Sequence, residues 1–394
     1  MVMLKIAIIG LGGRGQNLYR DAIKGRKNVN VVALCDNDTD FWGKPELVAE
    51  IKEEIGFEPR LYTDYKECID KEELDAVIIA TGWRQHIEIS MYAMEKGVAV
   101  GCEVGGAYSL ESLWDLVRCY ERTKTPIMML ENCCYGRLEL LALNMKRLGL
   151  LGRIVHCEGG YHHDLRWMAT FPKTYRTYEY IHRNSECYPT HEIGPIAKIL
   201  DINCGNRFVS LTSVGTGAFG MEEYIQKQNI EAFKGEKFNQ SDVVTTILKC
   251  ANGETVTITL DTCLPRYYSR GFMVQGTKGL IVEENSSVHL EGDKEEPWNE
   301  FYNNVNSYYE KYEHPIWKGY KPGEGGHGGM DVLLLNAFFG AVEKKEPMPL
   351  DVYDMATWMA ITILSEESMI TGRTVFFPDF TNGKWISNKN NFAK

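Results

Sequence analysis

A glycine motif near the start of the chain places the strongest constraint on its fold. The apolar run KIAIIG (5–10) leads into GLGGRG, where Gly10, Gly12 and Gly15 have the spacing G-x-G-x-x-G, and a helical pattern continues to residue 25. The first glycine permits a tight turn, the second lets the backbone approach a pyrophosphate, and the third lets helix and strand pack closely. A strand, this turn and a helix in that order predict a dinucleotide-binding unit.

The next apolar run ends in an acid that supports this interpretation. VNVVALCDND (29–38) carries Asp36, about 20 residues after the motif, where a carboxylate accepts hydrogen bonds from both ribose hydroxyls. The same charge repels a 2′-phosphate, so the sequence favours NAD over NADP. Arg14 and Lys24 are nearby cations that would weaken this preference, although Lys24 also fits an ordinary solvated helix charge.

Strands and helices alternate over the rest of the first third of the chain. Strands are predicted at 75–81, 98–104 and 126–132, and helices at 86–97 and 109–124. This order is typical of a parallel sheet with helices on both faces. The loop ATGWRQH (80–86) follows a strand on the rim that faces a cofactor in such sheets. Trp83 is therefore either a residue that flanks the nicotinamide or a rim aromatic that packs on the fold.

The pattern changes in the second part of the chain. Helices are predicted at 138–152 and 189–200, followed by alternating strand-like runs between 207 and 292 with a hairpin signal, NG, at 252–253. Late helices follow at 328–345 and 351–372. We predict an α/β protein with an N-terminal Rossmann dinucleotide-binding domain at 1–132. An α+β domain with a largely antiparallel open sheet follows at 133–394, and its late helices are candidates to pack back on the first domain.

Composition excludes several classes of partner. The 43 basic and 54 acidic residues give a net charge of −11, which argues against nucleic acid and anionic membranes. No apolar run approaches the roughly 20 residues of a membrane span. Eleven cysteines without C-x-x-C spacing, and an N-terminus without a separate signal segment, predict a cytoplasmic protein. We expect a small-molecule substrate and, from the open sheet, a homo-oligomer.

The stretch ECYPTHEIGPIAKIL (186–200) brings two proton-handling residues to the start of a helix. Tyr188 and His191 lie three positions apart, and Pro189 suits the first helical turn. Tyr188 and His191 are either a pair that transfers protons or ordinary residues of a first helical turn. A tyrosine, with an unperturbed pKa of about 10, needs a nearby cation or histidine to act as a base near neutral pH.

The order of GLGGRG, the acid-ended strand, ATGWRQH and EVGGA resembles the Gfo/Idh/MocA family of NAD(P)-dependent enzymes, which act mostly on sugars and cyclitols. Most members carry Glu-Lys-Pro at the end of the fifth strand, with the lysine assisting hydride transfer. This chain has Glu103, Val104 and Gly105 there, so the lysine is missing. The family's aspartate four residues before its second-domain histidine is also replaced, by Cys187.

With these departures the chain looks like one branch of that family, the NAD-dependent glycosidases typified by α-N-acetylgalactosaminidases (glycoside hydrolase family 109). The motifs MLENCCYGR, GGYHHDLR, YPTHEIGPIAKILDIN, LPRYYSRGFMVQGTKG and GHGGMD carry this resemblance over nearly the whole chain. It implies that NAD contacts Gly13, Arg14, Asp36, Trp83, Arg84, Gln85, His86, Glu103, Val104 and Asn132. It implies that the sugar site is lined by Tyr161, Arg176, Tyr188, Pro189, Thr190, His191 and Tyr268. The branch often has proline where this chain has Gly105.

The resemblance also implies a reaction. Most glycosidases use two carboxylates, but the NAD-dependent exceptions do not. They oxidise a ring hydroxyl, here at C3, which acidifies the C2 proton; its loss expels the C1 substituent, water adds at C1, and C3 is reduced again. We expect His191 to serve the C3 hydroxyl and either Tyr188 or Tyr268 to remove the C2 proton. Arg176 and His191 are the groups that would activate such a tyrosine.

Two other functions fit the same residues: an NAD-dependent sugar or inositol dehydrogenase that releases NADH, and a non-catalytic NAD-binding sensor.

No metal site is predicted. His162 and His163 are neighbours on a strand and point to opposite faces, and Pro195 interrupts an H-E-x-x-H pattern. His162 and His163 are expected to be pocket-rim or hydrogen-bonded residues, and His327 is either a sugar contact or an ordinary loop residue.

Overall fold

The computed structural model describes residues 3–38, 45–171, 175–293, 302–321 and 324–394. The chain divides into two compact units. The first contains Met1–Tyr135, Gly319–Ala356 and Asn391–Lys394, and the second contains Gly136–Lys318 and Thr357–Asn390. The sequence placed its domain boundary at 132/133, against the division at 135/136 in the structure.

A six-stranded parallel sheet forms the centre of the first unit. Its order is β3-β2-β1-β4-β5-β6, the order of a dinucleotide-binding Rossmann sheet. Every residue of β4 and β5 is buried, because helices cover both faces of the sheet. The strands are β1 (Leu4–Ile9), β2 (Val29–Cys35), β3 (Arg60–Tyr62), β4 (Ala76–Ile79), β5 (Ala99–Cys102) and β6 (Ile127–Met129).

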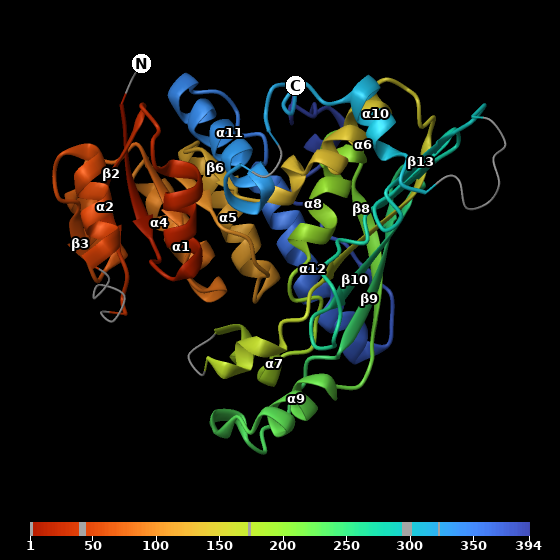
Figure 1. Ribbon diagram of the computed structural model, residues 1–394, viewed down its shortest axis with the longest axis horizontal. Helices are drawn as coiled ribbons and strands as arrows, with labels where there is room; N and C mark the ends of the chain where they lie inside the picture. Colours follow the sequence, from red (N-terminus) through yellow and green to blue (C-terminus); the bar gives the residue numbers. More distant parts are fainter. Residues whose placement is uncertain (1–2, 39–44, 172–174, 294–301, 322–323) are drawn as a thin grey trace. The chain divides into compact units, whose positions relative to one another are not determined.

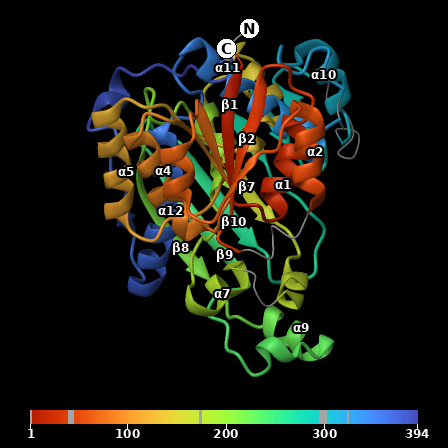
Figure 2. The ribbon, with the colours of Figure 1, turned by 90° about the vertical axis from the view of Figure 1, so that its left-hand side faces the viewer.

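Helices lie on both sides of this sheet. Figure 2 shows α1 and α2 on one side and α4 and α5 on the other. The late helix α11 also belongs to this unit and packs against the turns at Tyr19–Ile23 and Asn132–Tyr135. The helices are α1 (Gly13–Leu18), α2 (Pro45–Ile55), α3 (Tyr65–Lys71), α4 (His86–Glu95), α5 (Leu110–Thr123) and α11 (Met330–Lys344). The sequence patterns did not predict α2, β3 or α3; β3 has only three residues, two of them exposed.

The second unit is built on an eight-stranded sheet of order β13-β12-β11-β7-β10-β9-β8-β14. Among the strand pairs of this sheet in the described residues, only β7 and β10 run parallel, so the predicted largely antiparallel sheet is confirmed. The predicted hairpin at 252–253 is also confirmed, since β9 and β10 pair with Lys249 opposite Thr255. The strands are β7 (Ile154–His162), β8 (Phe208–Gly215), β9 (Val243–Cys250), β10 (Thr255–Asp261), β11 (Met273–Gly276), β12 (Gly279–Val282), β13 (Ser287–Leu290) and β14 (Val375–Phe376).

Helix α8 (Thr190–Ile199) packs on β7 and β10, near the middle of this sheet (Figure 1). The approach is close because β7 has a glycine where the helix passes: a Cβ on Gly159 would lie 2.5 Å from the Glu192 carbonyl oxygen. This contact fixes the start of α8 against the end of β7. The other helices are α6 (Arg137–Arg147), α7 (Tyr175–His182), α9 (Gly220–Gln228), α10 (Val305–Tyr312) and α12 (Val352–Thr371), which passes from the first unit to the second.

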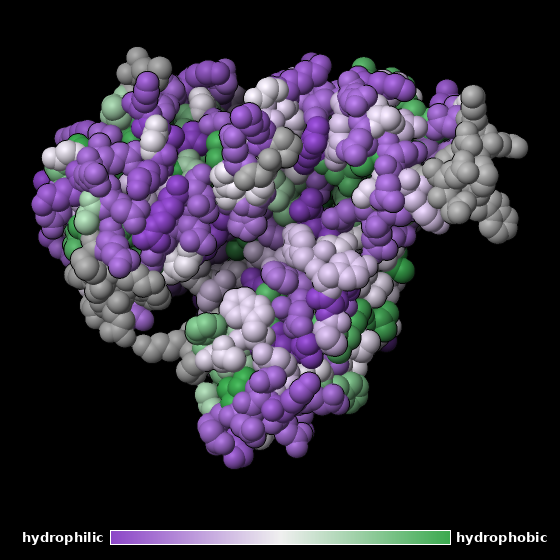
Figure 3. Space-filling model, viewed as in Figure 1, coloured by the Kyte–Doolittle hydropathy of each residue, from purple (hydrophilic) through white to green (hydrophobic). Residues whose placement is uncertain are grey.

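Hydrophilic residues predominate on the molecular face in Figure 3, and 25% of the residues of the chain are charged. None of the helices in the described parts of the chain has the length and apolarity that a bilayer span requires.

Candidate active site

The glycine loop between β1 and α1 has two closely packed glycines and two that face open space. A Cβ on Gly10 would lie 2.5 Å from the Ala80 carbonyl carbon, and Gly10 has a φ of +99° that favours glycine. A Cβ on Gly15 would collide with the Gly10 carbonyl oxygen. At Gly12 and Gly13, by contrast, a Cβ would have no atom of the described residues within 4 Å. The loop therefore packs closely on its own strand and helix at Gly10 and Gly15 and leaves room at Gly12 and Gly13, which is the arrangement that binds a dinucleotide.

Asp36 lies directly after β2 and is held against the glycine loop. Its Oδ2 accepts a hydrogen bond from the Leu11 amide at 2.6 Å, and its Oδ1 accepts one from the Asp38 amide at 2.9 Å. A carboxylate has about four acceptor positions, which is the capacity that binding of ribose hydroxyls requires. Lys24, one of the two cations near the glycine motif, forms an ion pair with Glu50 at 3.3 Å.

Arg14, in the first turn of α1, is enclosed by carboxylates. Its Nη1 and Nη2 donate to the two oxygens of Asp331 at 2.8 and 2.9 Å, and its Nε donates to Glu103 at 2.8 Å. Asp331 also accepts from Asn132 Nδ2 at 2.8 Å, and His327 Nδ1 lies 2.8 Å from its other oxygen. Three segments that are distant in sequence thus meet around one guanidinium.

Burial and pairing act against each other in this network. Burial would raise the pKa of Asp331, but hydrogen bonds from Arg14 and His327 hold it below its usual range. Burial also raises the pKa of Glu103, and Arg14 only partly offsets this. Because the guanidinium is committed to carboxylates, it does not supply the free cation that a 2′-phosphate would need.

The loop after β4 carries the expected NAD residues Trp83, Arg84, Gln85 and His86. Trp83 is buried, and a Cβ on Gly105 would lie 2.5 Å from its Cδ1, so the glycine at the branch's usual proline position gives the indole room. His86 Nε2 lies 3.0 Å from the Thr81 carbonyl oxygen. Burial lowers the pKa of His86 to about 4, so its imidazole is neutral.

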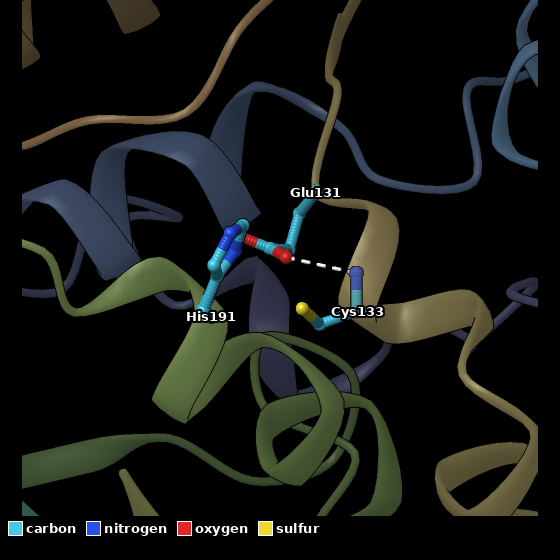
Figure 4. A group of neighbouring side chains, drawn as sticks. All are labelled: Glu131, Cys133 and His191. Carbon is cyan, nitrogen blue, oxygen red and sulfur yellow. Dashed lines mark hydrogen bonds between the residues drawn. The ribbon is translucent and has the colours of Figure 1, made fainter. Parts of the chain in front are cut away.

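The segment after β6 carries the last of the expected NAD residues. Asn132 is buried and binds Asp331, as described above. The neighbouring Glu131 is wholly buried, and its Oε1 accepts the Cys133 amide at 3.0 Å (Figure 4). Val104 is buried as well, and its amide lies 3.3 Å from Glu103 Oε2. All predicted NAD contacts, and His327, belong to the first unit.

The predicted sugar residues gather in the second unit around Tyr161, near the end of β7. The Tyr161 ring lies 4.6 Å from the Tyr188 ring, 5.5 Å from the His191 ring and 6.4 Å from the Tyr268 ring, centroid to centroid. Tyr188 and His191 themselves meet edge to face at 4.9 Å. The two residues at the entrance of α8 therefore share one aromatic cluster. We call Tyr161, Tyr188, His191 and Tyr268 the tyrosine–histidine cluster.

Arg176, on α7, brings a buried cation to this cluster. Its guanidinium carbon lies 4.5 Å from the Tyr188 ring centroid and 5.9 Å from that of Tyr161. Burial disfavours its charge, but surrounding tyrosine hydroxyls hold the pKa of Arg176 above its usual value. Pro189 and Thr190 form the start of α8; the Pro189 carbonyl accepts the first helical hydrogen bonds, and Thr190 is wholly buried.

Two histidines expected at a pocket rim or in hydrogen bonds, and one acid with no role predicted from the sequence, lie in or beside these clusters. His163 hydrogen-bonds Tyr161, whereas His162 packs under Gly160 and Gly271, so the two histidines do point to opposite faces. Asp331 was quoted in a motif but given no role. An acid in the first turn of a helix that begins after a glycine pair is the local signal that identifies such a residue.

Two buried carboxyl groups, Glu186 and Glu192, flank Tyr188 and His191 in the sequence, at and just before the start of α8. Both side chains are essentially inaccessible to solvent. Burial raises the pKa of Glu186 to about 8, and burial together with the charge of Glu186 raises the pKa of Glu192. Because burial favours the protonated form, the pair retains a proton at neutral pH.

We expect this pair to make the folded state less stable at alkaline pH. Between the ordinary carboxyl pKa and about 8 the folded chain holds more protons than the unfolded chain, so stability falls as pH rises through that window. Each unit of pKa difference corresponds to about 1.4 kcal/mol. Glu186→Gln should flatten this decline in chemical denaturation curves at pH 5 to 9, roughly the window the shift defines. Glu158→Gln, an exposed glutamate on β7, should keep the parent slope; equal slopes in all three proteins would contradict the assignment.

Family models match both parts of the chain. Residues 4–130 match the oxidoreductase family model with an NAD-binding Rossmann fold, and residues 135–387 match the C-terminal domain of glycosyl hydrolase 109. A glycosyl hydrolase family 109 protein of Stenotrophomonas maltophilia is 41% identical, covering 99% of this chain and 92% of its own. An alpha-N-acetylgalactosaminidase of Tannerella forsythia is 39% identical over 99% of this chain and 89% of its own.

Solved structures agree on the fold. Levoglucosan dehydrogenase in complex with NADH superposes with a TM-score of 0.72 at 21% identity, covering 95% of this chain and 99% of its own. Myo-inositol 2-dehydrogenase of Lactobacillus plantarum gives 0.69 at 19% identity, over 95% and 100%. Fold and glycine loop thus define an NAD-binding protein of the Gfo/Idh/MocA type. Within that class the chain belongs to glycoside hydrolase family 109, and it is an NAD-dependent glycosidase.

Proposed function

We propose that the chain hydrolyses α-N-acetylgalactosaminides. The observation that carries this proposal is the 39% identity to the alpha-N-acetylgalactosaminidase of Tannerella forsythia over nearly the full length of both chains. The tyrosine–histidine cluster with Arg176 supports it, because the groups gathered there are phenols, an imidazole and a guanidinium rather than the paired carboxylates of a conventional glycosidase.

The proposed roles follow from what each group can do with a proton. When bound, NAD supplies reversible oxidation of the C3 carbon of the sugar. His191 takes the C3 hydroxyl proton, since histidine is the side chain that exchanges protons near neutral pH. The resulting ketone acidifies C2–H, and loss of that proton expels the C1 substituent. Water then adds at C1, and because C3 is reduced again there is no net consumption of NAD.

We assign the C2 proton to Tyr188 rather than Tyr268. Tyr188 is buried, and the Arg176 guanidinium lies over its ring at 4.5 Å, whereas Tyr268 is 48% exposed. A cation close to a desolvated phenol favours the tyrosinate, which is the form that removes a proton from carbon.

Turnover of a panel of nitrophenyl glycosides in D₂O tests the function. We expect release of nitrophenol without accumulation of reduced nicotinamide absorbance, and a sugar product that carries deuterium at C2. Accumulation of reduced nicotinamide without nitrophenol would instead support a sugar or inositol dehydrogenase. NAD binding with neither product would support a sensor. Cleavage with C2 fully protonated, undiminished after removal of NAD, would indicate a conventional hydrolase.

We further propose a homo-oligomer that forms through the second sheet, where Val214 on β8 and Ile247 on β9 are exposed apolar residues. Light scattering that gave the mass of a single 44.9 kDa chain would contradict this.

We place the protein in the cytoplasm because its eleven cysteines are free thiols, ten of them buried, which suits a reducing compartment. Secretion of the native protein, detected by fractionation, would overturn that placement.

A further inference from the structure

The end of β7 brings a second histidine to the sugar cluster. Tyr161 and His163 are two residues apart along the chain, so their side chains leave on the same face. The Tyr161 hydroxyl oxygen lies 3.2 Å from His163 Nδ1, and the two rings meet edge to face with centroids 5.7 Å apart. His163 also meets the ring of Tyr268 edge to face at 5.2 Å.

The position of His163 is fixed from several sides. Its amide donates to the Asp261 carbonyl oxygen at 2.9 Å, which ties the residue to the end of β10. Contact with Tyr161 and Tyr268 then holds the imidazole between two of the residues assigned to the sugar. The ring is half-buried, so its orientation depends on these neighbours.

The charges around His163 favour its neutral form. Burial lowers the pKa of His163, and Arg176 and His191 lower it further, while Asp164 acts in the opposite direction. A neutral imidazole carries one N–H. With that proton on Nδ1, His163 donates to the Tyr161 oxygen, and the tyrosine keeps its own proton for another acceptor.

We propose that His163 is a positioning residue that makes Tyr161 the acid for the leaving oxygen, the one proton transfer of the reaction that has no residue assigned above. This rests on the proposed glycosidase function. As the C1–O bond breaks, the Tyr161 O–H proton moves to the departing oxygen, and the phenolate that remains accepts the hydrogen bond from His163 Nδ1. When water adds at C1, its proton returns to the phenolate.

The chemistry of the couple suits this task. A hydrogen bond donated to an anion favours that anion, and so does a nearby cation; Arg176 lies 5.9 Å from the Tyr161 ring centroid. A positioned general acid contributes about 10²- to 10⁴-fold. The contribution is largest for an alkoxide leaving group, which departs poorly without a proton, and smallest for nitrophenolate, which needs none.

Leaving-group dependence therefore tests the proposal. We expect His163→Phe to reduce kcat on a methyl or disaccharide substrate by about 100-fold, and on the nitrophenyl glycoside by only a few-fold. The phenylalanine keeps an aromatic ring against Tyr268 but lacks the nitrogen. Tyr161→Phe should show the same contrast, and the double variant should be no worse than either single one, because the two residues act as a unit.

The control is His156→Phe, also on β7, whose Nδ1 bonds Thr255 away from the cluster; it should behave as the parent with both substrates. Deuterium exchange at C2 should persist in His163→Phe, since it precedes departure of the leaving group. Equal losses on both substrates in His163→Phe would overturn the proposal and leave His163 with a packing role. A parent protein that cleaves neither substrate would instead reject the glycosidase function itself.

Discussion

The His191→Ala protein is expected to retain NAD and to lose glycoside cleavage by at least about 10³-fold, near the upper part of the range for a catalytic acid–base group. His191 lies in the first turn of α8, in contact with both Tyr188 and Tyr161. It is assigned the first proton transfer, on which every later step depends. Reduction of bound NAD on mixing with substrate should be lost together with release of the aglycone.

Two measurements separate this loss from general damage. NAD freed by denaturing the variant should equal that of the parent, because all residues proposed to hold NAD belong to the first unit and His191 belongs to the second. His156→Ala removes a histidine from β7 outside the cluster and should remain active. An His191→Ala protein that kept even a tenth of parental kcat would remove His191 from the mechanism.

The glycine loop and the acid after the next strand were predictable because their signals are local. The roles of Gly10, Gly12 and Gly15 follow from spacing within six residues. In the structure a Cβ would clash at Gly10 and Gly15 and would have room at Gly12, as this spacing implies. Asp36 follows from the end of the next strand. Asp331, in contrast, binds Arg14 across more than 300 residues, and no local pattern connects two residues that far apart.

The second unit was harder to predict, and β7 shows the reason. This central strand reads IVHCEGGYH, and its two adjacent glycines weaken the pattern of a strand. Those glycines serve tertiary packing instead: Gly159 admits α8, and Gly160 lies beside the imidazole of His162. The sequence places His162 and His163 on a strand but gives that strand no bounds, so the pairing of Tyr161 with His163 had no predicted framework, although the i, i+2 spacing is a period that strands use.

Gly159→Ala is expected to reduce glycoside cleavage by about 100-fold, the order of loss that an ångström-scale misplacement of a catalytic group can cause. The added Cβ would lie 2.5 Å from the carbonyl oxygen of Glu192 and 3.0 Å from Ile196 Cδ1. A backbone oxygen cannot rotate away as a side chain can, so α8 must move off β7. Glu192 directly follows His191, and a shift of the helix therefore carries the imidazole away from Tyr161. Overpacking of this kind also costs about 1–3 kcal/mol of stability.

Gly340→Ala is the matched control, because no atom of the described residues lies within 4 Å of its Cβ position on α11. It should keep full activity and gain up to about 1 kcal/mol from better helix propensity. Measuring kcat for cleavage and the midpoint of thermal unfolding on both variants distinguishes the outcomes. A stable, fully active Gly159→Ala protein would show that α8 does not depend on close contact with β7. The expected result is a Gly159→Ala protein that is destabilised, still folded at the assay temperature and slow in cleavage. That result would show that the position of the His191 imidazole depends on the close contact at Gly159.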